Sequence, residues 1–199
     1  MSRLFESIRI QNGRRYLLEY HSRRFNQSRK AIFGIDDPID LKKQIKVPDK
    51  CKQGLFKCRI VYDEKIRSIT FDPYNSNTVR TLRIVHDETI NYEYKYLERK
   101  NIDQLNKLSS GCDDILIVRN GLITDTSICN IIFLKGGKWV TPKVSLFRGV
   151  QRQQLLDKGI IKEANITLQQ LSNFTHFKLI NAMKPFSSAT IIPIDNIRF

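Results

Sequence analysis

The sequence is poor in the residues that build disulfide frameworks and zinc sites. Its 199 residues include four cysteines without a C-x-x-C pair, and three histidines, His21, His86 and His176, that are far apart in the chain. Both kinds of framework need closely paired ligands. We therefore expect reduced cysteines and no metal site, and any enzyme chemistry is expected to rely on lysine, a carboxylate or a cofactor.

Long apolar runs are also absent. None approaches the roughly 18 residues that a membrane-spanning helix needs. The first seven residues carry charges where a signal peptide would be apolar. With 41% hydrophobic and 27% charged residues, the composition is that of a globular chain. We expect a cytoplasmic protein without a membrane partner.

The charge is strongly one-sided. Lysine and arginine number 34 against 20 acidic residues, which gives a net charge of +14. Such an excess favours an anionic partner, from a phosphorylated cofactor to a nucleic acid, and does not choose between them.

Turn-forming residues divide the chain into two parts. Residues 72–77 combine proline, asparagine and serine without apolar periodicity, which predicts domains at 1–76 and 77–199. In the first domain we expect strands at Leu4–Ile10, Arg15–Tyr20, Leu55–Tyr62 and Ile66–Phe71, a helix at His21–Phe33 ended by Gly34, and a second helix between Pro38 and Pro48.

The second domain is expected to be rich in hairpins, with short helices. The predicted strands are Thr81–His86, Thr89–Tyr96, Ile115–Arg119, Leu122–Asp125, Ile131–Leu134, Lys138–Thr141, Phe177–Ala182 and Thr190–Ile194. The predicted helices are Ile102–Leu108, Val150–Asp157 and Leu168–Phe174. This pattern indicates an α+β protein whose sheets are mainly antiparallel.

Two segments carry residues suited to an aldehyde cofactor with a ring nitrogen. Lys95 is flanked by Tyr94, Tyr96 and Leu97, and a lysine amine in a dry pocket loses its proton and becomes nucleophilic. Asp125 ends one apolar stretch and Asn130 opens the next, so Asp125 could keep a pyridine nitrogen protonated. Each segment taken alone is better explained as a solvated strand lysine or as a turn between strands.

Two further segments suit a phosphate group. Gly149 precedes a predicted helix, so the N–H groups of Val150 and Gln151 would point at an anion. In His21-Ser-Arg-Arg-Phe25, Arg24 can offer a bidentate guanidinium. Taken alone, the first is a common loop–helix junction and the second a basic helix face in water.

Together these segments resemble the class IV aminotransferases, the pyridoxal phosphate (PLP) enzymes of fold type IV. His21-x-x-Arg24-Phe25 resembles the family's H-x-x-R-[LF] helix, Lys95-x-Leu97 its K-x-L motif, and Thr124-Asp125 with Asn130 its T-E-x-x-x-x-N motif with aspartate in place of glutamate. Thr141-Pro142 and Gly149-Val-x-Arg152 resemble its T-P and G-[VI]-x-R motifs, and Asn181-Ala182-Met183-x-Pro185 resembles a segment of aminodeoxychorismate lyases.

The resemblance implies a fold, a cofactor and a site. The fold is the two-domain D-amino-acid-aminotransferase-like α+β fold, with a small N-terminal α/β sandwich and a C-terminal, mainly antiparallel pseudo-barrel. Lys95 is the implied catalytic Schiff-base lysine. The implied PLP ligands are Arg24, Lys95, Asp125, Asn130, Gly149, Val150, Gln151, Asn181 and Ala182.

The implied activity is that of aminodeoxychorismate lyase, which releases pyruvate and p-aminobenzoate in the folate pathway. A transaminase for branched-chain or D-amino acids is the alternative within the family, and a member that binds the cofactor without turnover is another. The family's members generally act as homodimers on a small amino substrate. Outside the family, the positive charge and interleaved aromatic residues leave a nucleic-acid-binding protein as the alternative, although no nucleic-acid-binding signature is present.

Overall fold

The computed structural model describes residues 3–199, which form two compact units. The first unit contains the residues up to Ser76 together with Tyr94–Glu98. The second contains Asn77–Glu93 and Arg99–Phe199. The short segment Tyr94–Glu98 thus belongs to the first unit although it lies beyond residue 76 in the chain.

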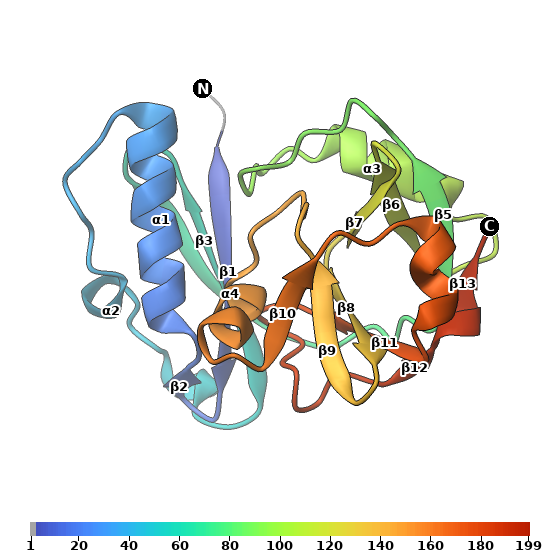
Figure 1. Cartoon of the computed structure of the whole chain (residues 1–199). Helices are drawn as coiled ribbons and strands as arrows, with labels where there is room; N and C mark the ends of the chain where they lie inside the picture. Colours follow the sequence, from blue (N-terminus) through green and yellow to red (C-terminus); the bar gives the residue numbers. More distant parts are fainter. Residues whose placement is uncertain (1–2) are drawn as a thin grey trace. The chain divides into compact units, whose positions relative to one another are not determined.

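The first unit is an antiparallel sheet covered by one long helix (Figure 1). Its strands run in the order β2-β1-β3-β4, and their bounds are Arg14–Arg15, Leu4–Gln11, Leu55–Tyr62 and Ile66–Pro73. Alternate residues of β1 and β3, such as Leu4, Ile8, Ile10 and Ile60, pack with Phe25 of helix α1 (Leu18–Phe33) in one core. The two-residue alternation of the sequence therefore selects the face that meets the helix.

Helix α1 begins earlier than the sequence predicts, and the second predicted strand is wrong beyond Arg15. The strand ends at Arg15, and the backbone at Leu17, which precedes the helix without a side-chain cap, is left-handed with φ of 55°. Because no capping residue marks this start, the pattern placed it at His21. Gly34 ends the helix as predicted, with φ of 71°. The second helix is the single turn α2 (Leu41–Gln44), capped by the Asp40 side chain.

The strand predicted at Thr89–Tyr96 is absent. The side chain of Asp87 accepts hydrogen bonds from the N–H groups of Thr89 and Ile90, at 2.8 and 3.0 Å, and turns the chain out of the sheet. Further on, the segment pairs with the start of β1: the Phe5 N–H donates to the Lys95 carbonyl at 2.9 Å, and the Leu97 N–H donates to the Arg3 carbonyl at 2.8 Å. Lys95 is therefore fixed by backbone bonds to β1 rather than by a strand of its own.

The second unit is built on a nine-stranded sheet. Seven strands follow the order β10-β9-β8-β7-β6-β5-β13, and β11 pairs with β8 and β12. Their bounds are β5 Leu82–His86, β6 Asp114–Arg119, β7 Leu122–Thr126, β8 Asn130–Lys135, β9 Lys138–Pro142, β10 Ile161–Ala164, β11 His176–Ile180, β12 Ile192–Pro193 and β13 Ile197–Arg198. The helices are α3 (Lys100–Asn106) and α4 (Val150–Asp157), and 3-10 turns cover Lys107–Ser109, Leu168–Asn173 and Ile194–Asn196.

Most strand pairs are antiparallel, as predicted, but three are parallel. These are β5 with β6, β13 with β5, and β10 with β9. Strands β10 and β13 were not predicted, because each is a short edge strand of two to four residues without alternation long enough to detect. The segment Leu168–Asn173 is a 3-10 turn where an α-helix was predicted, and it is closed by a capping box at Thr167 and Gln170.

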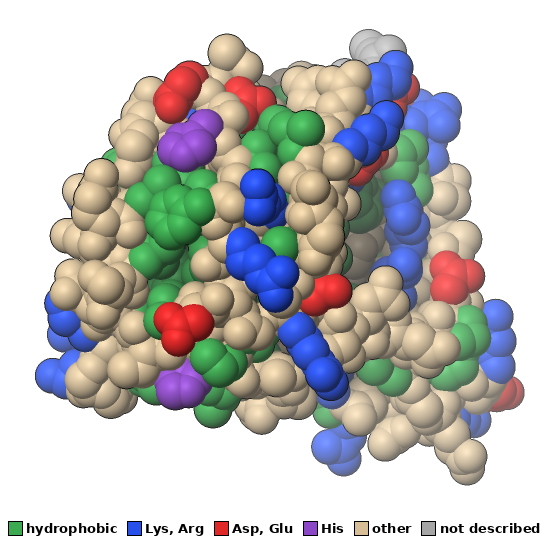
Figure 2. All heavy atoms as spheres, turned by 90° about the vertical axis from the view of Figure 1, so that its right-hand side faces the viewer, with side chains coloured by type: hydrophobic (Ala, Val, Ile, Leu, Met, Phe, Trp, Pro, Cys, Tyr) green, Lys and Arg blue, Asp and Glu red, His purple; other side chains and the backbone are tan. Residues whose placement is uncertain are grey.

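Basic residues are dispersed over the surface in view. On the face shown in Figure 2, Lys and Arg side chains are interspersed with acidic and apolar ones. No helix within residues 3–199 combines the length and the apolar character required to cross a bilayer.

Candidate active site

Lys95 of the first unit lies over an aromatic ring. Its Nζ is 4.6 Å from the centroid of the Phe5 ring, and the residue is half-buried. Tyr94 and Tyr96, on either side of it in the chain, meet edge to face with centroids 6.2 Å apart. The Phe5 ring shields the amine from water on one side, and partial desolvation favours a nucleophilic amine.

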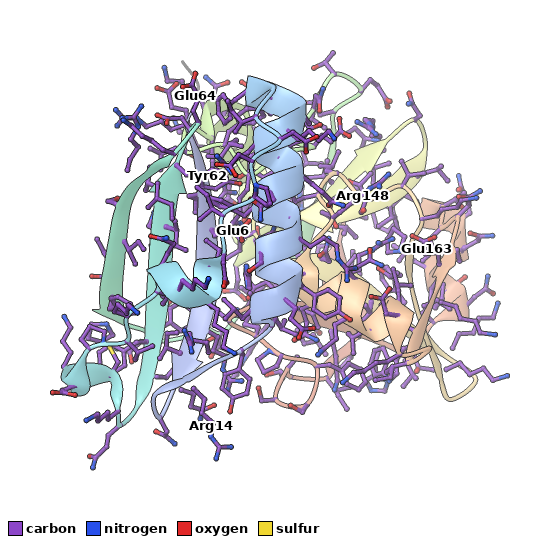
Figure 3. All side chains as sticks on the ribbon, turned by 90° about the vertical axis from the view of Figure 1, so that its left-hand side faces the viewer. Glu6, Arg14, Tyr62, Glu64, Arg148 and Glu163 are labelled. Atoms are coloured by element: carbon purple, nitrogen blue, oxygen red, sulfur yellow. The ribbon has the colours of Figure 1, made fainter. Side chains whose placement is uncertain are left out.

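Arg24, also in the first unit, is held by a buried carboxylate. Glu6 on β1 is fully buried and accepts hydrogen bonds from Arg24 Nε at 2.9 Å and Arg24 Nη2 at 2.5 Å. It also binds His21 Nδ1 at 2.6 Å. Figure 3 shows Glu6 next to helix α1, which carries both partners. One carboxylate therefore fixes the planar guanidinium of Arg24 through two parallel bonds.

The charges of this cluster follow from its hydrogen bonds. Burial alone would raise the pKa of Glu6, but Arg24 and His21 outweigh it and lower that pKa to about 2. Burial lowers the pKa of His21, against the opposing effect of Glu6. At neutral pH, Glu6 is therefore ionised and His21 is neutral, so His21 Nδ1 must be the N–H that donates to the carboxylate. His21 Nε2 is then a buried acceptor, and it has no hydrogen-bond partner within residues 3–199.

Asp125 of the second unit is a buried carboxyl in a network of donors. Its Oδ1 accepts from Asn130 Nδ2 at 2.7 Å, and its Oδ2 accepts from the backbone N–H of Phe147 at 2.9 Å. Asn130 Nδ2 also donates to the Phe147 carbonyl at 2.8 Å. The hairpin of β7 and β8, where Asp125 and Asn130 are paired residues, thus holds the loop that leads to Gly149.

Burial raises the pKa of Asp125 to about 6, although Asn130, the Phe147 N–H and Arg152 all act in the opposite direction. A cation or a charged N–H beside a buried carboxyl stabilises the ionised form of that carboxyl. This is what a protonated pyridine nitrogen would provide.

The raised pKa predicts how stability depends on pH in the protein without cofactor. Between pH 3.8 and about 6, the folded protein keeps a proton on Asp125 that the unfolded chain has released. We therefore expect this group to reduce the free energy of unfolding by about 3 kcal/mol as the pH rises through that window. Urea unfolding of the wild type and of Asp125→Asn, measured from pH 3.5 to 7.5, isolates the effect as the difference between the two curves. Parallel curves would show that the carboxyl titrates normally.

The N-terminus of helix α4 packs closely against the side chain of Asn130. Gly149 precedes the helix, and a Cβ at this position would overlap with Oδ1 of Asn130. Val150 and Gln151, the first two residues of the helix, are buried. Their N–H groups have no partner within a helix, so this end of α4 suits an anion. Arg152 is held away from it by the Pro142 carbonyl at 2.9 Å and by Glu163 at 2.6 Å.

Asn181 closes a turn after β11. Its Oδ1 accepts from the N–H groups of Met183 and Lys184 at 2.8 and 2.9 Å, and its Nδ2 contacts Cys129 Sγ at 3.2 Å. The side chain is therefore occupied in shaping the 181–184 turn, and Ala182 lies within that turn. If this segment contacts a phosphate, as the resemblance implies, the contact would come from its backbone and not from the Asn181 side chain.

The predicted site residues fall into two groups. Arg24 and Lys95 belong to the first unit. The second unit holds Asp125, Asn130, Gly149, Val150, Gln151, Asn181 and Ala182. The prediction missed Glu6 and the Phe147 backbone, which orient Arg24 and Asp125. The signal for Glu6 was a charged residue in register with the apolar residues Leu4, Ile8 and Ile10 of the same strand. No group of three or more metal-ligating side chains occurs within residues 3–199.

A family profile described as "Amino-transferase class IV" matches residues 3–194. The chain belongs to the class IV aminotransferase family. The family's members are PLP-dependent enzymes, so the choice between an enzyme and a nucleic-acid-binding protein is decided for the enzyme. The mixed helix-and-sheet architecture of this chain is that of fold type IV, as predicted.

The similar proteins include two lyase candidates and one uncharacterized protein. The crystal structure of a candidate 4-amino-4-deoxychorismate lyase from Haemophilus somnus 129PT is 32% identical, with a TM-score of 0.87 over 94% of this chain and 98% of that one. An uncharacterized protein of Haemophilus influenzae is 36% identical over 90% of this chain and 97% of its own length. A candidate aminodeoxychorismate lyase of Schizosaccharomyces pombe is 26% identical over 96% and 90%.

Proposed function

We propose that this protein is a PLP-dependent 4-amino-4-deoxychorismate lyase, which converts its substrate into p-aminobenzoate and pyruvate for folate synthesis. The observation that carries the proposal is the match to the Haemophilus somnus lyase candidate over nearly the full length of both chains. The motif Asn181-Ala182-Met183-x-Pro185, which resembles a lyase segment, adds to it. We further propose that the enzyme works as a cytoplasmic homodimer, as the family generally does.

The residues present fit the cofactor. The N–H groups of Val150 and Gln151 at the start of helix α4 suit a phosphate, as does the Arg24 guanidinium. The buried carboxyl of Asp125 suits the ring nitrogen, and the half-buried amine of Lys95 is the attachment point. Asn130 supports this set by holding Asp125, and Asn181 and Ala182 contribute the turn after β11.

PLP, when bound, draws electrons from the carbon that bears the substrate amine. Lys95 would act as the base that takes a proton from that carbon, and as the acid that returns one. Asp125 would hold a proton at the ring nitrogen, which keeps the ring electron-poor. The atoms of the substrate then divide completely between the two products: the bond to the enolpyruvyl oxygen breaks, the ring becomes aromatic, and the released enol takes up a proton as pyruvate.

One assay separates the lyase from the transaminase. The purified protein, loaded with PLP, is incubated with 4-amino-4-deoxychorismate and, separately, with L- and D-amino acids plus 2-oxoglutarate. We expect p-aminobenzoate and pyruvate in equal amounts from the first incubation, and slow or no glutamate formation in the second. Glutamate formed from a branched-chain or D-amino acid, without p-aminobenzoate, would instead identify a transaminase. PLP binding without turnover of either would identify a degenerate member.

A further inference from the structure

Arg99 closes the base of the loop that carries Lys95. This loop, drawn in green in Figure 1, leaves the second unit after Glu93, contributes Tyr94–Glu98 to the first unit and returns at Arg99, directly before helix α3. Across the base, the Cζ of Arg99 lies 5.5 Å from the centroid of the buried Tyr92 ring. A guanidinium at this distance is attracted by the electrons of the ring, so the contact holds the two ends of the loop together.

The same guanidinium reaches the turn between Asp125 and Asn130. Nη2 of Arg99 donates a hydrogen bond to the carbonyl of Ser127 in that turn. The N–H of Ser127 donates in turn to Oδ1 of the buried Asp114 at 3.3 Å. Nε of Arg99 is also buried, without a hydrogen-bond partner in the described part of the chain, so protein encloses this end of the side chain. One side chain therefore ties the base of the loop to the hairpin of β7 and β8.

Tyr92 extends these contacts to the loop that precedes helix α4. Its ring lies 5.8 Å from the ring of Phe147, centroid to centroid, a separation at which aromatic rings attract each other. The N–H of Phe147 donates to Oδ2 of Asp125 at 2.9 Å. The two aromatic rings therefore connect the Arg99 guanidinium to the loop whose backbone holds the Asp125 carboxyl.

We propose that Arg99 is a positioning residue for the reaction. Through its contact with Tyr92 it fixes the loop that presents the Lys95 amine, and through its hydrogen bond to Ser127 it fixes the hairpin that presents the ring-nitrogen partner, Asp125. This inference rests on the proposed function, because it takes Lys95 as the lysine that moves the proton. A displacement of about 1 Å between reacting groups can lower a rate by about 100-fold, so the loss of this clamp should appear in turnover.

Kinetics of three variants of the PLP-loaded protein test the proposal. Arg99→Met keeps most of the side-chain volume and removes both contacts of the guanidinium, so kcat for 4-amino-4-deoxychorismate should fall by about 10- to 100-fold with little change in KM. Arg99→Lys keeps the charge without the planar fork and should recover part of kcat. The matched control, Arg198→Met, removes an exposed guanidinium from strand β13 of the same unit and should behave as the wild type. An unchanged kcat in Arg99→Met, or a rise in KM alone, would overturn the proposal.

Amide hydrogen exchange in the protein without cofactor gives a readout that is independent of activity. The N–H groups of Leu97 and Phe147 donate to the Arg3 carbonyl and to Asp125, so they report on the loop and on the Asp125 network. In Arg99→Met both should exchange at least about 10-fold faster relative to the central amides of strand β8.

Equal acceleration of all these amides would show that Arg99 supports the fold as a whole, and would overturn the proposal. If the wild type turns over no amino substrate, the proposed function fails, and the exchange pattern still decides whether Arg99 holds the two segments.

Discussion

Replacing Lys95 by alanine is expected to lower turnover by at least about 10⁴-fold. In the proposed function, Lys95 would supply both the attachment point for the cofactor and the group that moves the proton, so two functions would be lost together. The fold should tolerate the change, because the backbone bonds of this segment to Phe5 and Arg3 do not involve the lysine side chain. Steady-state kinetics of the wild type and the variant at saturating PLP measure the effect.

Covalent labelling makes the assignment specific. Borohydride reduction of the PLP-loaded wild type, followed by peptide mapping, should find the cofactor on Lys95. Lys178 is the informative comparison, because burial lowers its pKa and its Nζ already donates to the Phe186 carbonyl at 3.0 Å. The exposed Lys43 provides a matched variant, and Lys43→Ala should label and turn over as the wild type does. Label on Lys178 or any other lysine, with Lys95 unmodified, would overturn the assignment.

The fold was predictable where one rule decides the local structure. The strands Leu55–Tyr62 and Ile66–Pro73 alternate and are joined by a short turn, and helix α4 has the predicted bounds. The start of helix α1 was not predictable, because Leu17 adopts positive φ without being glycine or asparagine. The segment before Lys95 reads as a strand by residue type, but one side chain, that of Asp87, folds it into a turn.

The motifs of the candidate site can be recognised in the sequence, whereas the residues that support them cannot. Arg24, Lys95 and Asp125 stand in segments whose residue types suggest their chemistry. The sequence gives no such indication for Glu6, because a glutamate in a strand usually faces water. Its role arises from the pairing of β1 with helix α1, which brings the carboxylate against His21 and Arg24.

Replacing Glu6 by alanine is expected to reduce the free energy of unfolding by about 3–5 kcal/mol, because it leaves buried partners without their charge partner. His21 Nδ1 and two nitrogens of Arg24 lose their acceptor. The matched control is Asp36→Ala, which removes the carboxylate of an exposed pair with Lys30 in the same unit and should cost about 1 kcal/mol at most. Urea unfolding of the three proteins without cofactor, at pH 7, measures both values.

The pH dependence separates the charge of Glu6 from its packing. The pKa of Glu6 is lowered from 4.5 to about 2 in the folded protein, so the stabilisation is fully present above pH 4.5 and is lost as the pH falls toward 2. The difference in stability between the wild type and Glu6→Ala should therefore shrink over that interval. A difference that stays constant with pH would mean that the residue acts by filling space.

The cofactor provides the last distinction. If Glu6 orients the Arg24 guanidinium for a phosphate, Glu6→Ala should weaken the binding of PLP more than the binding of pyridoxal, which lacks the phosphate. Arg24→Ala should likewise reduce the ratio of the affinity for PLP to the affinity for pyridoxal. The double variant should reduce this ratio little further than either single variant, because both residues act on one interaction. Additive losses in the double variant would instead show that the Glu6 carboxylate and the Arg24 guanidinium affect cofactor binding independently.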